Sequence, residues 1–177
     1  RARAIRQAEP RIAQAILAAV VECPLPEIDR ELTRLLAEGA DMPSLLCALS
    51  RAERMRKNAP AELGELVRRG GPAAGAAAAM LADPNACRSI LRGRDAPAQR
   101  MLLACARMIR TPLAAEDVAA LWRPGDKLTV LACERYLESA DSPEARKAVW
   151  SRHPGRPPVL GARLSFAPAS DFFRGYD

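Results

Sequence analysis

Apolar residues recur along this chain with the period of an α-helix, and short polar turns interrupt them. The apolar residues Leu113, Val118, Leu121 and Trp122 fall on one broad helical face, and so do the leucines at 128, 131 and 137. This is the spacing of helices that pack by one side. Proline follows a capping residue at several turns, as at Asp83 and Pro84, where its fixed φ suits the first turn of a helix. The pattern predicts helices at residues 11–22, 26–38, 42–57, 60–69, 72–82, 84–92, 96–110, 112–122, 126–140 and 143–152.

The composition agrees with this pattern. Hydrophobic residues make up 49% of the chain but aromatic residues only 4%, so the apolar side chains are mainly alanine and leucine, which are strong helix formers. With 177 residues the chain is long enough to bury a core without disulfides or metals. We therefore predict an all-α fold, in which short links make consecutive helices antiparallel neighbours.

One motif occurs twice, as LACARMIR from Leu103 and as LACERYLE from Leu131. Other segments share a form in which two apolar residues end a helix, a glycine or arginine turn follows, and Asp or Gly opens the next helix; they begin at Leu35, Leu66, Ile90 and Leu121. This spacing indicates repeated helical hairpins. We predict a repeat domain over 1–153, with units at 26–57, 60–82, 84–110 and 112–140 and a terminal helix at 143–152, followed by a non-helical extension over 154–177.

The segments DPNACRSILRGRDAPAQRMLLACARMIRTP and AAEDVAALWRPGDKLTVLACERYLESADSP resemble HEAT and armadillo-type repeats, in which paired antiparallel helices stack into a curved solenoid. The resemblance covers about residues 26–152, and the units are shorter than the ~40 residues usual for that class. It implies a right-handed HEAT-like solenoid that acts as a binding surface, and it brings no catalytic residues with it. The alternatives are another helical-hairpin array or an irregular bundle.

The cysteines favour packing over chemistry. Cys105 and Cys133 stand at the same place in the two copies of the motif, with Cys47 close to the matching place in an earlier helix. Small apolar residues surround all three, so we predict buried thiols and not nucleophiles. The five cysteines are widely spaced and contain no C-x-x-C pair, which argues against a disulfide framework or a zinc site.

The remaining candidates for catalysis are weak. His153 is the only histidine and has no cysteine or carboxylate near it in sequence, which favours a surface position over a base or a ligand. The pairs Glu116 with Asp117 and Glu134 with Glu138 are predicted to lie on solvated helix faces. No glycine-rich phosphate loop is present. We predict that the protein is not an enzyme and binds no cofactor or metal.

Basic residues gather on two predicted helices. The formal charge is +6, from 27 basic and 21 acidic residues, and nearly all the positive charge is arginine; this indicates first the composition of a bacterial genome and second a preference for phosphate. Guanidinium groups on one surface can follow a phosphate backbone or an acidic peptide, whereas the alternative is a solvated face that complements the helix dipoles. The candidate binding residues are Arg51, Arg54, Arg56, Lys57, Arg100, Arg107, Arg110 and Arg135.

Two further segments stand out. Pro72 to Ala82 carries no charged or polar side chain, which predicts the buried middle of the stack, with an exposed groove floor as the alternative. From Pro154 the helical period stops, and the extension contains all three phenylalanines of the chain. Because disordered tails are usually poor in aromatics, we predict that it docks, in cis or onto a partner, through Phe166, Phe172, Phe173 and Tyr176.

These observations favour a protein-binding or scaffolding module within a larger protein or assembly, with a nucleic-acid-binding solenoid as the alternative. No apolar run is long enough to cross a bilayer. The first residues, RARAIRQAEP, lack the apolar core of a secretory signal. We therefore expect a cytoplasmic protein with a protein partner and no membrane insertion.

Overall fold

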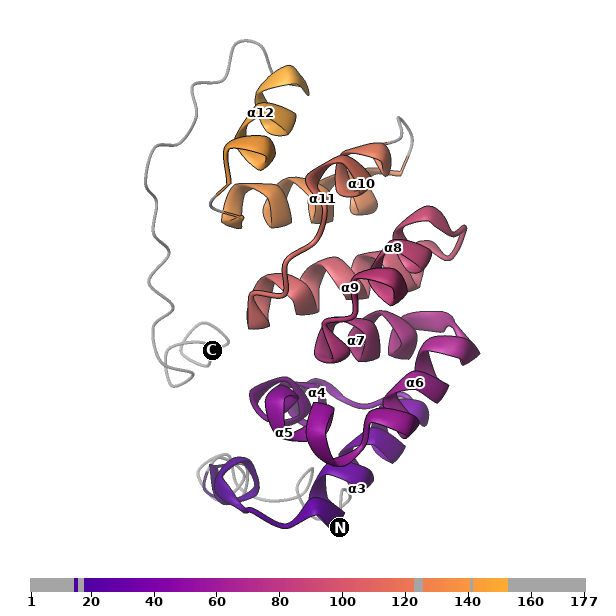
Figure 1. The fold of residues 1–177 in the computed structure, drawn as a ribbon, viewed down its shortest axis with the longest axis vertical. Coiled ribbons are helices and arrows are strands. Elements are labelled where there is room, and N and C mark those ends of the chain that lie inside the picture. The colour runs from indigo at the N-terminus through magenta and orange to yellow at the C-terminus, as the bar shows by residue number, and fades with distance from the viewer. Residues whose placement is uncertain (1–14, 16–17, 123–125, 141, 153–177) are drawn as a thin grey trace, which may run out of the picture.

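The computed structural model describes residues 15, 18–122, 126–140 and 142–152. Every regular element among these residues is a helix, and the helices follow one another in chain order along the long axis of the molecule (Figure 1). The predicted all-α class is therefore confirmed. The helices are α3 (Pro26–Ala37), α4 (Met42–Ser50), α5 (Ala52–Asn58), α6 (Pro60–Arg69), α7 (Gly71–Leu81), α8 (Pro84–Arg92), α9 (Ala96–Ile109), α10 (Ala115–Ala120), α11 (Lys127–Ser139) and α12 (Pro143–Arg152).

Aspartate caps open several of these helices, as the sequence predicts. The carboxylates of Asp41, Asp95 and Asp126 each accept a hydrogen bond of 3.0 Å from the backbone N–H three residues later. Each bond satisfies one of the N–H groups that the first turn of a helix leaves without a partner, and a cap of this kind stabilises a helix by about 1 kcal/mol. The caps explain why the predicted and observed starts of α4, α9 and α11 agree within one residue.

The structure differs from the prediction at two places. The helix expected over 42–57 is divided into α4 and α5 at Arg51. The helix expected from residue 112 begins only at Ala115, because Thr111 and Leu113 are held by other helices. The Thr111 hydroxyl donates to the Ala79 carbonyl of α7 (2.8 Å), while the Tyr136 hydroxyl of α11 donates to the Thr111 carbonyl (3.1 Å) and accepts from the Leu113 N–H (2.7 Å).

The helices form two layers. In the second layer α5 contacts α7, α7 contacts α9 and α9 contacts α11. In the first layer α3 contacts α6, α8 contacts α10 and α10 contacts α12. The first-layer helices α3, α6, α8 and α10 are each followed in the chain by a helix that packs against them, as α7 does against α6. The molecule is thus an all-helical stack with mostly local contacts (Figure 1).

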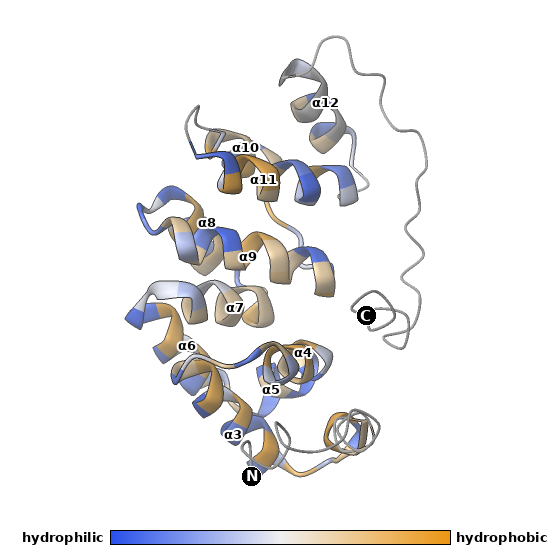
Figure 2. Ribbon diagram, turned by 180° about the vertical axis from the view of Figure 1, so that it is seen from behind, coloured by the Kyte–Doolittle hydropathy of each residue, from blue (hydrophilic) through white to orange (hydrophobic). Residues whose placement is uncertain are grey.

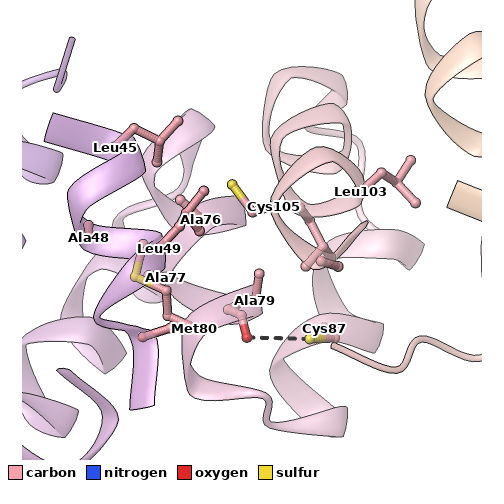
Figure 3. Close-up of a cluster of buried hydrophobic side chains, with 14 of the residues drawn as sticks. Leu45, Ala48, Leu49, Ala76, Ala77, Ala79, Met80, Cys87, Leu103 and Cys105 are labelled. Carbon is pink, nitrogen blue, oxygen red and sulfur yellow. Dashed lines mark hydrogen bonds between the residues drawn. The ribbon is translucent and has the colours of Figure 1, made fainter. Parts of the chain in front are cut away.

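Helix α7 lies at the centre of this stack. Residues 74–80 are all buried, and α7 shows no strongly hydrophilic residue in Figure 2. Leu45 of α4 and Cys105 of α9 lie on either side of Ala76 (Figure 3), and α4 also contacts α9 directly. The prediction of a buried middle is confirmed, and the burial of these residues excludes the alternative of an exposed groove floor.

Alanine and glycine let α7 and α9 come very close. A Cβ atom built on Gly75 would lie 2.2 Å from the Ala98 carbonyl oxygen and 2.7 Å from the Leu102 nitrogen, distances at which atoms overlap. No side chain larger than hydrogen fits there without moving one of the helices. The small residues of α7 therefore set the spacing of the two central helices.

The N-caps give a common numbering for α4, α7, α9 and α11. The tenth residue after the N-caps Asp41, Gly70, Asp95 and Asp126 is buried in every case, and these residues are Arg51, Met80, Cys105 and Tyr136. Cys133 is only the seventh residue after its N-cap. The prediction that Cys105 and Cys133 occupy the same place is therefore wrong by about one helical turn, although both lie in the core.

Candidate binding surface

Four of the five cysteines belong to the core and not to a reactive site. Cys47, Cys87, Cys105 and Cys133 are buried free thiols. Burial raises the pKa of Cys105 to about 12, and it is the main cause that raises the pKa values of Cys87 and Cys133 to about 11. These groups are neutral thiols at physiological pH, and the predicted packing role is confirmed.

Asp117 was predicted to lie on a solvated helix face, but it is buried. Its side chain is only 6% exposed, and it accepts hydrogen bonds from Nε of Arg88 (3.1 Å) and Nε of Arg92 (2.9 Å) of α8. Burial by itself raises the pKa of Asp117, but the hydrogen bonds and charges of Arg92 and Arg88 outweigh it and hold that pKa below its ordinary value. The carboxylate therefore joins α8 to α10, while Glu116 and Glu138 are exposed as predicted.

Arg51 is not a surface residue, and its assignment to a phosphate-binding surface is wrong. The side chains of Arg51 and Asp29 are both 0% exposed, and Nε of Arg51 lies 2.7 Å from Oδ1 of Asp29. Asn58 donates to the other carboxylate oxygen of Asp29 (2.7 Å). Nη1 of Arg51 donates to the carbonyls of Val20 (2.8 Å) and Val21 (3.0 Å). The guanidinium thus fixes the end of the helical residues 18–22 on the stack.

Three more candidate arginines are engaged within the molecule. Nη1 of Arg54 donates to the Cys23 carbonyl (3.0 Å), and Nε of Arg56 donates to the Met80 carbonyl at the end of α7 (2.9 Å). Nη1 of Arg100 lies 3.6 Å from a carboxylate oxygen of Asp126. These contacts satisfy carbonyls or a cap at helix ends. Arg54, Arg56 and Arg100 therefore already bind groups of their own chain, whether or not a ligand also contacts them.

The other four candidates, Lys57, Arg107, Arg110 and Arg135, form no hydrogen bond or ion pair with any residue that the structure describes. Lys57 is in α5, Arg107 and Arg110 are at the end of α9, and Arg135 is in α11. All except Arg107, which is half-buried, are exposed. Among the described residues, Arg107, Arg110 and Arg135 are therefore basic side chains without an internal partner on the adjacent helices α9 and α11.

Large exposed apolar side chains gather on the same two helices. Met108 of α9 is 37% exposed, and Leu128 and Leu131 of α11 are 65% and 41% exposed. The sequence pattern placed Leu128 and Leu131 on the packed face of their helix, and this prediction is wrong. The packed face consists of Thr129, Cys133, Tyr136 and Leu137, so a threonine and a tyrosine with hydrogen-bond partners take core positions that the pattern assigned to leucine.

Helix α9 is covered on three sides. Its Gln99 amide donates to carbonyls at the end of α8, including that of Gly93 (2.9 Å), its Ala98 and Leu102 face Gly75 of α7, and its Arg100 reaches α11. The open side carries Met101, Ala104 and Met108 at helical spacing, with Ala104 and Met108 exposed and Met101 partly exposed. We call these three residues the α9 stripe.

The exposed side of α11 has a different character. Leu128, Leu131, Arg135 and Glu138 are all exposed and lie one turn apart along the helix. Figure 2 shows the resulting alternation of hydrophobic and hydrophilic residues along α11. We call these four residues the α11 end face, since α11 is the last helix of the second layer in the described part of the chain.

The predictions for the only histidine and for the aromatic residues of the C-terminal extension cannot be compared with the structure. His153, Phe166, Phe172, Phe173 and Tyr176 lie outside the described residues. Within the described ranges, no group of three His, Cys, Asp or Glu side chains is arranged to hold a metal ion. No described helix has both the length and the apolar character needed to cross a membrane.

Comparison with known proteins found no match among protein families, curated proteins or solved structures.

Proposed function

We propose that this chain is a non-catalytic helical-repeat module that binds a protein partner, as part of a larger protein or assembly. The α9 stripe is the observation that supports the proposal most. It presents Met101, Ala104 and Met108 on the open side of a helix whose other sides are packed, and Arg107 and Arg110 lie beside it without internal partners in the described chain. Methionine adapts its shape to a partner, and arginine is enriched in protein interfaces.

The proposal includes a right-handed solenoid of short antiparallel hairpins similar to HEAT repeats. The two layers and the local contacts between successive hairpins support it. In such an array each unit buries its apolar face only against its neighbours, and the surface that this stacking creates is the usual place for a partner. A cytoplasmic location is part of the same proposal, supported by five free thiols.

The nucleic-acid alternative has less support. Of the eight candidate residues, Arg51 is buried with Asp29, and Arg54, Arg56 and Arg100 contact other helices. An RNA or DNA backbone would thus meet a weaker basic surface than the sequence suggests, and binding by charge alone falls steeply with salt. We expect weak retention of the chain on heparin at physiological salt.

A photocrosslinking experiment tests the protein-binding proposal. A benzophenone amino acid replaces Met108 in the α9 stripe, and in a matched variant it replaces Glu62, which is exposed on α6 in the other layer. After irradiation in the native cells, we expect one discrete protein adduct at position 108 and none at position 62. The adduct is then identified and its partner purified.

The purified partner gives the quantitative test. We expect Met108→Glu to weaken binding at least about tenfold, which is about 1.4 kcal/mol, because the substitution buries an unpaired charge in an apolar interface, while Glu62→Lys leaves the affinity unchanged. Equal affinities of both variants would refute the α9 stripe as the binding site. Adducts with RNA at position 108, together with steep salt dependence, would favour the nucleic-acid alternative instead.

A further inference from the structure

The α9 stripe lies on a side of the second layer that α4 covers at the preceding helix. The sixth and ninth residues after the N-cap are Ala76 and Ala79 in α7 and Met101 and Ala104 in α9. Ala76 and Ala79 are buried, and Leu45 of α4 lies beside Ala76 (Figure 3). In α9, Ala104 is exposed and Met101 is half-buried. The side that a helix of the same chain closes on α7 is thus open on α9.

Helix α4 borders this open side. It contacts α9 directly, and the buried Cys105 of α9 lies across Ala76 from Leu45 (Figure 3). Met101 and Met108 are each one helical turn from Cys105, so the stripe begins where the contact with α4 ends. A second helix packed beside α4, about 8–10 Å from its axis, would therefore contact α9 on the stripe.

Two arginines without internal partners among the described residues border the stripe on its α11 side. Arg107 lies two helical turns after Arg100, whose guanidinium reaches Thr129 of α11 (3.4 Å), so Arg107 is on the side of α9 that faces α11. Arg135 is the ninth residue after the N-cap of α11, the position that Ala104 has in the stripe, and it is exposed. A ligand on the stripe therefore meets cations where it approaches α11.

The acidic side chains of the surrounding described helices lie on other sides. Helices α4 and α7 contain no charged residue, and α9 contains no acidic one. Glu134 and Glu138 of α11 stand at the positions that Leu103 and Arg107 have in α9. Since that side of α9 faces the next helix, the matching side of α11 faces away from the stripe. Even with Glu138 included, the net charge beside the stripe is +2, from Arg107, Arg110, Arg135 and Glu138.

The stripe offers a partner side chains only, because the backbone groups of α9 bond to one another within the helix. A segment that contacts the stripe must therefore satisfy its own backbone hydrogen bonds. An α-helix does so, whereas an extended peptide needs the edge of a sheet, and every regular element of the described chain is a helix.

We infer that the partner binds here as an acidic amphipathic helix. Its apolar side contacts Met101, Ala104 and Met108, and acidic residues along one side of it pair with Arg107 and Arg135. The helix lies beside α4 and extends to α9 and α11 the cover that α4 gives to α7. The inference rests on the proposed function, to which it adds the charge and the secondary structure of the partner's binding segment.

A phage-displayed library of random peptides tests the inference. The peptides have about 16 residues, enough to span α9, whose 14 residues measure about 21 Å. The library is selected for binding to the full chain and depleted against the Met108→Glu variant. We expect the enriched peptides to carry apolar residues at helical spacing and a negative net charge.

Exchange of charges then tests the pairing with Arg107. Fluorescence anisotropy measures the affinity of an enriched peptide, which should fall about fivefold with Arg107→Glu, because attraction becomes repulsion. The matched control is Arg30→Glu, at an exposed residue of α3 in the other layer, which should leave the affinity unchanged. A peptide with its glutamates replaced by lysine should bind Arg107→Glu more tightly than it binds the native chain. This rescue also shows that the variant is folded.

Enriched peptides without a helical apolar period, or with a neutral or positive net charge, would overturn the inference. Equal affinities of the Arg107→Glu and Arg30→Glu variants would overturn it too, and so would a library without any peptide that distinguishes the chain from Met108→Glu. In each of these cases a protein adduct at position 108 would still support the proposed function, because photocrosslinking does not depend on the charge or the secondary structure of the partner.

Discussion

At the scale of single residues, Gly75 determines how closely the two central helices approach. We expect Gly75→Ala to reduce the free energy of unfolding by about 2 kcal/mol or more, because its Cβ would overlap the backbone at Ala98 and Leu102. Gly64→Ala is the matched control, since no atom lies within 4 Å of a Cβ built there. It should stabilise the protein by up to about 1 kcal/mol through helix propensity. Urea denaturation measures both, and equal effects of the two changes would contradict this packing.

Because of Cys105, the free energy of unfolding should depend on pH in the alkaline range. Its pKa is raised to about 12 in the folded protein, whereas an unfolded thiol ionises near pH 8.5. The stabilisation is complete below about pH 8.5 and is lost as the pH rises towards 12, because only the unfolded chain releases this proton. We expect the free energy of unfolding to fall less between pH 8 and 10 in Cys105→Ala than in the native chain. Parallel pH profiles of the two proteins would rule out this contribution.

At the scale of elements, the first hairpin replaces an apolar core pair with a charged one. Asp29 is the fourth residue of α3, where α6 and α8 have Leu63 and Cys87. Arg51 stands where α7 has Met80. All of these side chains are buried. The ion pair thus occupies positions that are apolar in the later helices. Unlike the apolar residues there, Arg51 also donates hydrogen bonds to the carbonyls of residues 20 and 21.

This arrangement predicts strong coupling between the two charges. Asp29→Leu alone leaves the buried guanidinium without its carboxylate and should cost roughly 3–5 kcal/mol. The double variant Asp29→Leu, Arg51→Met should be more stable than that single variant, since its core then resembles the one around Leu63 and Met80. A double-mutant cycle in urea measures the coupling. Additive effects of the two substitutions would show that the charges stabilise the fold independently.

The linker before α10 shows how tertiary contacts can shorten a helix. Arg110 ends α9 in the left-handed region with φ of 57°, and the Tyr136 hydroxyl binds both Thr111 and Leu113. Proline after threonine gives the same local signal as a helix start. The hydroxyl contacts come from residues distant in sequence, so the local pattern could not indicate where α10 begins.

At the scale of the whole molecule, the mostly local contacts between neighbouring helices predict a gradient of stability. Helices α7 and α9 share the closest packing, and α7 is buried over residues 74–80, whereas α3 and α12 each have neighbours on fewer sides. We expect native-state hydrogen exchange to be slowest in α7 and α9 and to become faster towards α3 and α12. Uniform protection across all helices would instead indicate a single cooperative unit.

The sequence by itself determined the helical class, most helix boundaries and the buried centre. These features follow from short-range physics: aspartate caps bind N–H groups three residues away, proline fits only the first turn, and an uncharged alanine helix is stable only when buried. The buried cysteines follow in the same way from their apolar neighbours in sequence.

The tertiary structure alone decided which polar residues are buried and which apolar ones are exposed. Arg51 and Asp117 carry the same charge as their exposed neighbours in sequence, and they are buried because Asp29 and the pair Arg88 and Arg92 approach them from other helices. Leu128 and Leu131 fit the apolar period but are exposed. Helical periodicity shows which residues share a face, but the position of the neighbouring helix determines which face of the helix is buried.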